Sequence, residues 1–370
     1  MSSVAAKQVP LPQTGYDLYR LGTTLDLKFK AHESTEYKDL AATVIKRFEP
    51  FTCAAVLLVQ RHSDNEQVIL KLADRRLGYR SNIKDVDTVP WTSCIDDHLR
   101  RAVRDIQAGS IPDWFEFISD FDNRPDFEHW EDWMWEVSTW YGKMGSYKKE
   151  LAAYQLLHRL QGRYIPRLFG VVRLRITPES TPLHPITDVV LGLVFEYIPG
   201  VSMDKLRPGV DVSEQEAERI SSAVMEGLRA IEAENCLLHR DIHTRNVVVR
   251  EGNRSAVIID FGGASIRKAG TSDEDWRMNV HGGPDTRYMR RLLVDPENGR
   301  WKRNVTPYEM SDWHYAKPLA FNEYVESVPE DFRRATFERV LDTDWPGARE
   351  KVYQWRIRPG VRCRHGYDYD

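Results

Sequence analysis

One stretch, residues 236–262, constrains the fold of this 370-residue chain more than any other. It contains His239-Arg240-Asp241, with Asn246 five residues beyond the aspartate, and it ends in Asp260-Phe261-Gly262. Between these motifs lie two short runs of valine and isoleucine, separated by a polar turn. Paired apolar runs around a turn predict a β-hairpin, here with a loop on each side. The pattern therefore brings two carboxylates and one carboxamide to neighbouring loop ends.

The two motifs, H-R-D-x-x-x-x-N and then D-F-G, resemble the catalytic core of the protein-kinase-like fold. The resemblance implies phosphoryl transfer from ATP, with Asp241 facing the acceptor hydroxyl and with Asn246 and Asp260 holding Mg²⁺ on the phosphates. The alternative is a buried hairpin between polar turns, in which Asp241 and Asn246 only cap the backbone. Capping does not require the whole set of motif residues, so we favour the first interpretation.

Lys71 and Glu150 are expected to form an ion pair beside this core. The strand and turn signals predict three strands, at 42–48, 54–60 and 68–72. Lys71 lies in the third strand, where an unpaired buried cation is costly, and Glu150 lies among apolar neighbours on a helix predicted to begin at Ser146. The resemblance implies that Lys71 binds the α- and β-phosphates of ATP while Glu150 holds it. The alternatives are a strand lysine that reaches solvent and a first-turn glutamate stabilised by the helix dipole.

A segment that resembles the interlobe hinge of kinases follows two further predicted strands, at 165–176 and 189–197. In Phe195-Glu196-Tyr197-Ile198, the resemblance implies that backbone groups of Glu196 and Ile198 bind adenine and that Phe195 is the gatekeeper. The chain departs from the family between its first two predicted strands, where Glu49-Pro50-Phe51-Thr52-Cys53 replaces the usual G-x-G-x-x-G. Pro50 supplies no N–H for phosphate, so only amides such as those of Thr52 and Cys53 remain.

The expected fold class is α+β, a bilobal protein-kinase-like fold with a small β-rich N-lobe and a shortened, mainly helical C-lobe. The predicted divisions are an irregular leader at 1–40, an N-lobe at 41–198 with a long insertion at 75–145, a C-lobe at 199–345, and a C-terminal tail at 346–370. Ser213 and Glu216 form a capping-box signature for a long C-lobe helix. The broader resemblance, over 42–265, is to the divergent protein-kinase-like proteins that are abundant in fungi.

The insertion combines an amphipathic helix with an acidic, aromatic second half. Ile95, Leu99, Val103 and Ile106 recur at helical spacing. Residues 112–140 are too rich in tryptophan and phenylalanine for a disordered segment. We expect a subdomain packed on the N-lobe, and the alternative is a surface that recruits a partner.

Net charge, hydropathy and cysteine content limit the expected cellular location and binding partners of the chain. A formal net charge of −4 gives no basic footprint for nucleic acid. The longest apolar run, near 189–195, is too short to cross a membrane, and the N-terminus has no apolar signal core. Four scattered cysteines without a C-x-x-C pair favour a reducing compartment. We therefore expect a soluble intracellular protein, cytoplasmic or nuclear, that binds neither nucleic acid nor membrane.

Three hypotheses for function remain open. The first is a divergent Ser/Thr-type protein kinase that uses ATP and Mg²⁺ to phosphorylate a protein hydroxyl. The second is a small-molecule phosphotransferase. The sequence D-I-H-T-R-N resembles the D-x-H-x-x-N pattern of aminoglycoside- and choline-kinase-like enzymes, and it has His243 where protein kinases usually have lysine. In addition, no convincing A-P-E motif follows. The third is a non-catalytic pseudokinase that serves as a binding module, favoured by the missing glycine loop.

Overall fold

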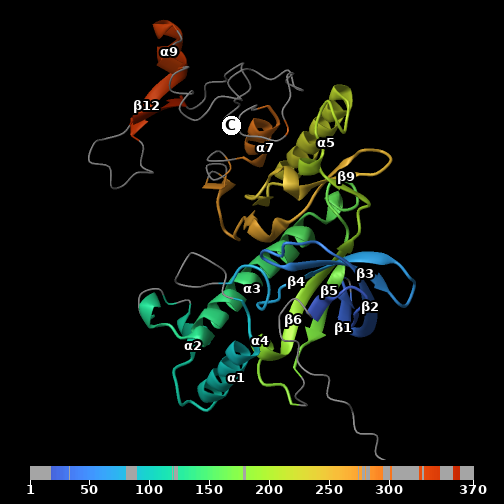
Figure 1. Ribbon diagram of the computed structural model, residues 1–370. Coiled ribbons are helices and arrows are strands. Elements are labelled where there is room, and N and C mark those ends of the chain that lie inside the picture. The colour runs from blue at the N-terminus through green and yellow to red at the C-terminus, as the bar shows by residue number, and fades with distance from the viewer. Residues whose placement is uncertain are drawn as a thin grey trace, which may run out of the picture.

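The chain forms a strand-rich N-terminal part and a C-terminal part built around helices, as the computed structural model shows (Figure 1). A long helix, α3 (Asp132–Leu156), reaches from the first part towards the second. The structure describes residues 18–32, 34–80, 90–118, 120, 124–177, 181–273, 275–276, 280, 284–294, 301, 325–326, 329–341 and 353–358.

A closed barrel makes up the strand-rich part, with the strands in the order β1-β2-β3-β4-β6-β5. The strands are β1 (Thr24–Ala31), β2 (Lys38–Arg47), β3 (Ala55–Arg61), β4 (Gln67–Leu72), β5 (Leu168–Arg175) and β6 (Val189–Glu196). Every pairing between neighbours is antiparallel, and inward-facing leucines and valines fill the interior. The predicted strands at 42–48, 54–60, 68–72, 165–176 and 189–197 are confirmed within a few residues.

Strand β1 corrects the prediction of an irregular leader for part of the range 1–40, of which residues 1–17 lie outside the described residues. Leu25, Leu27 and Phe29 alternate with polar residues, and this period of two is the pattern of a half-buried strand. The glycine and proline residues before the strand obscured that signal in the sequence. Strand β1 pairs with β2 on one side and with β5 on the other, so it closes the barrel.

Helix α3 corrects two further predictions, because it begins at Asp132 and ends at Leu156. The sequence suggested a start at Ser146, after Gly145, and a stop near Gly162. Gly142 and Gly145 instead lie inside the helix. Trp133 and Val137 are buried against the rest of the insertion, and this packing stabilises the first half of the helix despite its weak local signals. The end of the predicted insertion, from Asp132, and the helix that carries Glu150 are therefore one continuous element.

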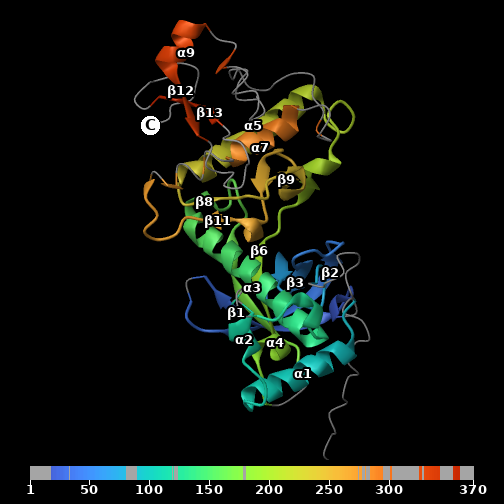
Figure 2. The same cartoon turned by 90° about the vertical axis from the view of Figure 1, so that its left-hand side faces the viewer.

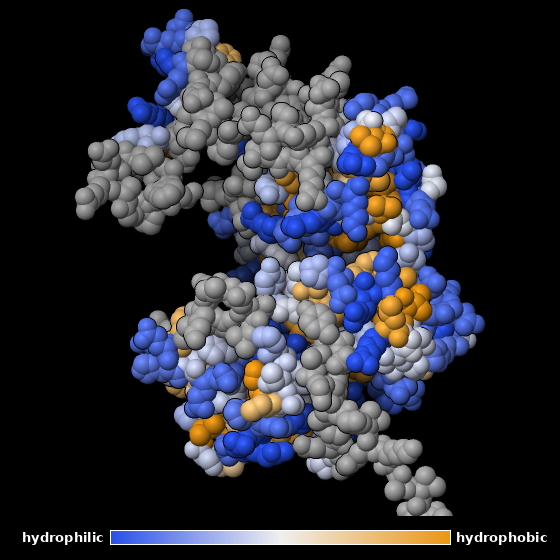
Figure 3. All heavy atoms as spheres, viewed as in Figure 1, coloured by the Kyte–Doolittle hydropathy of each residue, from blue (hydrophilic) through white to orange (hydrophobic). Residues whose placement is uncertain are grey.

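The aromatic residues of the insertion pack mainly on one another. Helices α1 (Ser93–Gln107), α2 (Trp114–Phe117) and α4 (Pro185–Asp188) surround the first half of α3 (Figure 2). The ring of Trp114 lies 5.3 Å from that of Trp130 and 5.9 Å from that of Trp133, edge to face in both pairs. The rings of Trp114, Trp130 and Trp133 are buried, and the face shown in Figure 3 is mostly hydrophilic over this region. The aromatic content is thus largely explained by a local core.

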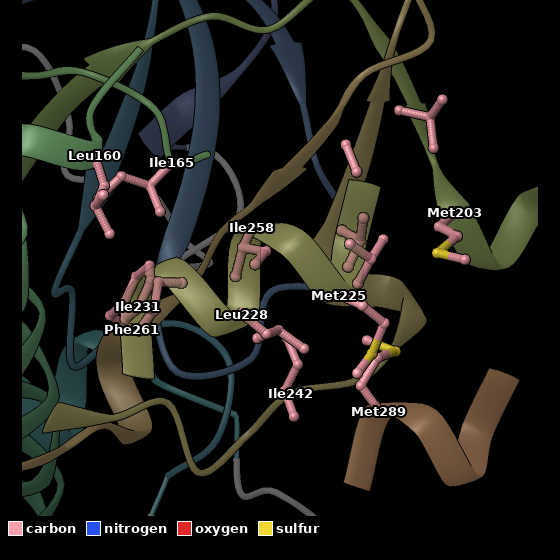
Figure 4. Packing of buried hydrophobic residues seen from close by; sticks show 14 of the residues in the cluster. Leu160, Ile165, Met203, Met225, Leu228, Ile231, Ile242, Ile258, Phe261 and Met289 are labelled. Atoms are coloured by element: carbon pink, nitrogen blue, oxygen red, sulfur yellow. The ribbon is translucent and has the colours of Figure 1, made fainter. Parts of the chain in front are cut away.

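The C-terminal part packs around α5 (Glu214–Ala233), whose first residues are capped by the Ser213 side chain as predicted. Its remaining elements are β7 (Gly200–Ser202), β8 (Leu237–Leu238), β9 (Val247–Arg250), β10 (Ala256–Ile258), β11 (Ser265–Ile266) and α7 (Asp285–Val294). Met225 of α5 and Met289 of α7 point toward one another in the core (Figure 4). This core also includes Tyr154 of α3 and Phe195 of β6, so it joins the two parts of the chain.

The last described elements are a short helix and a pair of strands. Helix α9 (Glu330–Thr336) is followed directly by β12 (Phe337–Leu341), which pairs with β13 (Tyr353–Ile357). The predicted boundary at 345/346 therefore falls between two paired strands. Across the described ranges, we find no helix with the length and apolar character needed to cross a membrane.

Candidate functional site

A cavity of about 180 Å³ lies between the β2–β3 loop, β4, α3 and the loops at either end of the β9–β10 hairpin. Four of the predicted site residues line it: Lys71, Glu150, Asp241 and Asp260. Asn246, Glu196 and Ile198 are not among its lining residues. The sequence motifs, separated by almost two hundred positions, thus meet at one surface of the cavity.

Lys71 lies between two carboxylates. Its Nζ is 2.7 Å from Glu150 Oε2 and 2.7 Å from Asp260 Oδ1, so the ion pair predicted between Lys71 and Glu150 is present. Burial disfavours the charged amine, but the two carboxylates outweigh it and raise the pKa of Lys71 above its ordinary value. Burial also opposes ionisation of Asp260, yet the Lys71 ammonium holds the pKa of that carboxyl below its usual range. Burial raises the pKa of Glu150, although its carboxylate lies 2.7 Å from Lys71 Nζ and that cation favours the charged form.

The catalytic-loop motif is fixed from behind by Asp285, the first residue of α7. Its carboxylate accepts hydrogen bonds from the backbone N–H of His239 at 2.5 Å and from that of Arg240 at 3.0 Å. Arg240 has a φ of 64°, a left-handed conformation that costs a residue with a side chain about 1–2 kcal/mol. The two charge-assisted hydrogen bonds that these N–H groups donate to the buried Asp285 carboxylate offset this cost, and they set the direction in which the chain enters Asp241.

His239 is held as a neutral imidazole. Its Nδ1 lies 3.3 Å from the backbone N–H of Asp241, which can only donate, so Nε2 carries the proton and donates to Ile259 O at 2.9 Å. Burial lowers the pKa of His239, which agrees with this tautomer. The ring also packs on Phe261, 4.6 Å between centroids, and Phe261 contacts Tyr154 of α3 at 5.5 Å. The two motif loops and α3 are thus locked to one another through aromatic contacts.

Asn246 and His243 orient the segment that carries Asp241. Asn246 Nδ2 donates to the backbone oxygen of Asp241 at 2.8 Å, and the N–H of Asn246 donates to His243 Nδ1 at 3.2 Å. The other ring nitrogen of His243, Nε2, therefore carries the proton, and it lies 3.7 Å from Asp241 Oδ1. The Asp241 side chain is 58% exposed, so its carboxylate is open to a ligand in the cavity.

The donor set fits a hard divalent cation only in part. Asp260, with φ of 69°, presents a carboxylate at the cavity wall, and Asn246 supplies an amide oxygen nearby in sequence. Carboxylate and amide oxygens are the ligands that Mg²⁺ takes, usually with phosphate oxygens and water completing its shell. Among the described residues there is no cluster of three or more histidine, cysteine, aspartate or glutamate side chains for a metal. These residues are therefore suited to Mg²⁺ bound together with a nucleotide and not to a metal held by the protein alone.

Glu196 and Ile198 lie where β6 leaves the barrel for the C-terminal part. The backbone N–H of Glu196 donates to Arg167 O at 2.9 Å, while its side chain pairs with Arg250 at 3.4 Å. Phe195, before it, is buried against Tyr154, 4.6 Å between ring centroids. The segment thus links the two parts, and its role in binding adenine stays a prediction.

A family model of known proteins matches part of the chain. Residues 143–288 match the family model of the protein kinase domain. The chain carries a protein-kinase-like domain. The matched range begins within α3 and ends within α7, so it includes Glu150, both catalytic motifs and Asp285. Such a domain implies a bilobal fold and the general use of ATP and Mg²⁺.

Two curated protein kinases are similar to parts of the chain. Serine/threonine-protein kinase D from Synechocystis sp. is 37% identical over 70 residues, which is 19% of this chain and 13% of that protein. Protein kinase wis1 from Schizosaccharomyces pombe is 31% identical over 141 residues, which is 35% of this chain and 22% of that protein. The similarity therefore spans less than a quarter of either relative.

Two residues of the site were not predicted from the sequence. Asp285 begins α7 and binds the backbone of the catalytic loop. Lys143 falls within the predicted insertion, but it lies on α3 and lines the cavity. An aspartate just before an amphipathic run is the only sequence signal for the first, and none marks the second because the start of α3 was placed too late.

Proposed function

We propose that the chain is an ATP-dependent phosphotransferase, a divergent protein kinase of the Ser/Thr type, acting on a hydroxyl group. The observation that carries the proposal is the position of Lys71 between Glu150 and Asp260 at the wall of a cavity that also contains Asp241. The similarity of the kinase-like domain to two protein kinases supports a protein acceptor. A pseudokinase has no requirement to keep all of these groups in working contact.

Each side chain has a distinct task in this proposal. Asp241 accepts or orients the proton of the acceptor hydroxyl, and Asn246 and His243 fix the direction of its carboxylate. Lys71, kept charged by Glu150, neutralises phosphate oxygens, and the backbone of Glu196 and Ile198 positions the base. Mg²⁺, held by oxygens of Asn246 and Asp260, would supply further charge neutralisation during the transfer. Positioning and electrostatic stabilisation account for most of such catalysis.

Two measurements test the proposal. The first is turnover and melting temperature of Asp241→Asn and Asp260→Ala. We expect turnover to fall by about 10²-fold or more in each variant, while the melting temperature stays close to that of wild type, because both groups act on the reacting atoms. Full activity in either variant would contradict the assignment. The second is a thermal-shift titration with ATP, with and without Mg²⁺, since a ligand that binds the native state raises its stability by mass action. A wild-type chain that shows no shift at millimolar ATP would favour the pseudokinase hypothesis.

A small-molecule acceptor is the second candidate, and His243 is the observation that favours it. A neutral imidazole 3.7 Å from the Asp241 carboxylate takes the place of the lysine that protein kinases present to the transferring phosphate. A screen of protein and metabolite hydroxyl acceptors with wild type and His243→Lys separates the two. Phosphorylation of metabolites alone would favour the second candidate over the first.

A further inference from the structure

Lys143 is a buried cation at the cavity that the proposed mechanism leaves without a task. It lies on α3 one and two turns before Tyr147 and Glu150, so the three side chains share one helix face, and all three line the cavity. Only 5% of Lys143 is exposed. Burying a lysine is costly without a partner for its charge, and such a residue therefore calls for a functional explanation.

The contacts of Lys143 are to neutral oxygens. Its Nζ lies 3.3 Å from Thr52 O and 3.1 Å from Cys53 O, both in the loop between β2 and β3. Within the described residues, no carboxylate forms an ion pair with it. Asp74, whose negative charge acts to raise the pKa of Lys143, is already bound by Arg76 and by the Tyr19 hydroxyl. Burial consequently lowers the pKa of Lys143 to about 8, and its charge is uncommitted.

The loop that Lys143 contacts is held in place from the other side. Phe51 is buried in the barrel core, and the N–H of Tyr79 donates to Thr52 O at 3.0 Å. Gly78, with φ of 68°, lets the two segments approach so closely that a Cβ atom there would lie 1.9 Å from Thr52 O. A fixed, glycine-free loop cannot adapt its amides to a nucleotide as a glycine-rich loop does.

Three of the charged groups at the cavity are carboxylates, which repel a polyphosphate. Glu150 and Asp260 both pair with Lys71, which reduces the positive charge that Lys71 offers to a polyphosphate, and Asp241 adds a further carboxylate. A nucleotide triphosphate bound there requires an additional positive group beyond Mg²⁺ and Lys71. Lys143 is the side chain at this wall whose charge is not matched by a carboxylate among the described residues.

We propose that Lys143 is a second phosphate-binding cation, which contacts the polyphosphate of the bound nucleotide and replaces the function of the missing glycine-rich loop. The inference rests on the proposed function, because it requires a nucleoside triphosphate in this cavity. It makes Lys143 a binding residue of the site, as distinct from a purely structural link between α3 and the loop.

Isothermal titration with MgATP and with adenosine tests the assignment on full-length wild type, Lys143→Gln and Lys143→Arg. Glutamine keeps a donor for the loop carbonyls but has no charge, and Lys149→Gln removes an exposed lysine from the same helix as a control. We expect MgATP affinity to fall about ten- to a hundredfold in Lys143→Gln, as for loss of a hydrogen bond to a charged group. Adenosine affinity stays unchanged, Lys143→Arg regains most of the MgATP affinity, and Lys149→Gln behaves as wild type.

The pH dependence gives a second readout that a structural role does not produce. Charged and titratable groups around Lys143 are Asp74 and Arg80 after β4, Cys53 in the loop, and, across the cavity, Lys71, Glu150, Asp241 and Asp260. A phosphate would stabilise the protonated amine, so wild-type affinity for MgATP falls about tenfold between pH 7 and pH 9 as Lys143 deprotonates. Arginine stays charged over this range, and the fall is lost in Lys143→Arg.

The outcomes separate the inference from the proposed function. If wild type binds MgATP and Lys143→Gln binds it equally well, Lys143 is a structural link and the inference is overturned. The same conclusion follows if MgATP and adenosine lose equal affinity, or if Lys143→Arg keeps the wild-type pH dependence. If wild type fails to bind MgATP at all, the proposed function fails, and the inference fails with it.

Discussion

Replacing Asp285 tests whether the catalytic loop depends on a carboxylate 45 residues downstream of Arg240. Its two oxygens accept the N–H groups of His239 and Arg240, and its side chain is buried. A hydrogen bond to a charged group contributes about 1.5–3 kcal/mol, so Asp285→Ala, which loses both, should lower the free energy of unfolding by about 3–6 kcal/mol. Asp285→Asn keeps the shape and one acceptor, and should cost about 1.5–3 kcal/mol.

Glu232→Gln is the matched control. The Glu232 carboxylate, on α5, accepts two hydrogen bonds from Thr286, the residue next to Asp285, from its N–H at 2.9 Å and from its hydroxyl at 3.1 Å. The control therefore weakens the same end of α7 without touching the catalytic loop. Chemical denaturation measures the stability of each variant, and phosphoryl transfer to an acceptor measures turnover at a temperature where all are folded.

We expect Asp285→Asn and Glu232→Gln to lose comparable stability, and only Asp285→Asn to lose turnover, by about tenfold or more. Arg240 has a strained backbone, and without the second acceptor its left-handed conformation is no longer offset. A variant Asp285→Asn with wild-type turnover, or with a stability loss below about 0.5 kcal/mol, would show that the catalytic loop does not depend on the Asp285 carboxylate. So would an equal loss of turnover in Glu232→Gln, because the effect would then follow from general loosening of α7.

Two further predictions concern stability. Glu136 is buried on α3 and pairs with Arg75 at 2.6 Å and with Arg80. Glu136→Gln leaves buried guanidinium groups poorly compensated, so it should lower the free energy of unfolding, measured by chemical denaturation, by about 3–5 kcal/mol. Glu128 is exposed, and Glu128→Gln should have little effect. His239 is buried and its pKa is lowered, so as the pH falls below about 6.5 its imidazole takes up a proton in the unfolded chain but not in the native chain. The free energy of unfolding should therefore decrease from pH 7.5 to pH 5.5. The decrease should be smaller in His239→Gln. An equal decrease in that variant would assign the effect to other groups.

The sequence predicted the charged residues of the site better than the residues that hold them in place. Lys71 and Asp260 were predictable because an apolar strand with one lysine and the D-F-G motif are local patterns. The resemblance to a known fold implied the ion pair of Lys71 with Glu150, whereas the contact of Lys71 with Asp260 was not predicted. Asp285 was not predictable in the same way, because its partners are backbone N–H groups far away in the chain, and backbone groups leave no trace in residue identity. Tertiary contacts of this kind are absent from periodicity and capping signals.

The start of α3 is a second feature that local sequence patterns did not predict. Gly142, Gly145 and Ser146 together look like the end of a loop and the beginning of a helix, and glycine inside a helix costs about 1 kcal/mol relative to alanine. The helix nevertheless runs through them, because Trp133 and Val137 are buried in the aromatic core of the insertion. Packing of an apolar face contributes more to helix stability than local propensity does, and it can override two glycines.

A continuous α3 also changes how the insertion relates to the site. The first half of the helix is fixed by the aromatic core and by the buried pairs of Glu136, and the second half carries Lys143 and Glu150 at the cavity. An α-helix is stiff over 25 residues, so the position of Glu150 relative to Lys71 depends on packing that lies several turns away. The insertion is therefore part of the support of the candidate site, and the aromatic residues that stood out in the sequence act on it through the helix that they anchor.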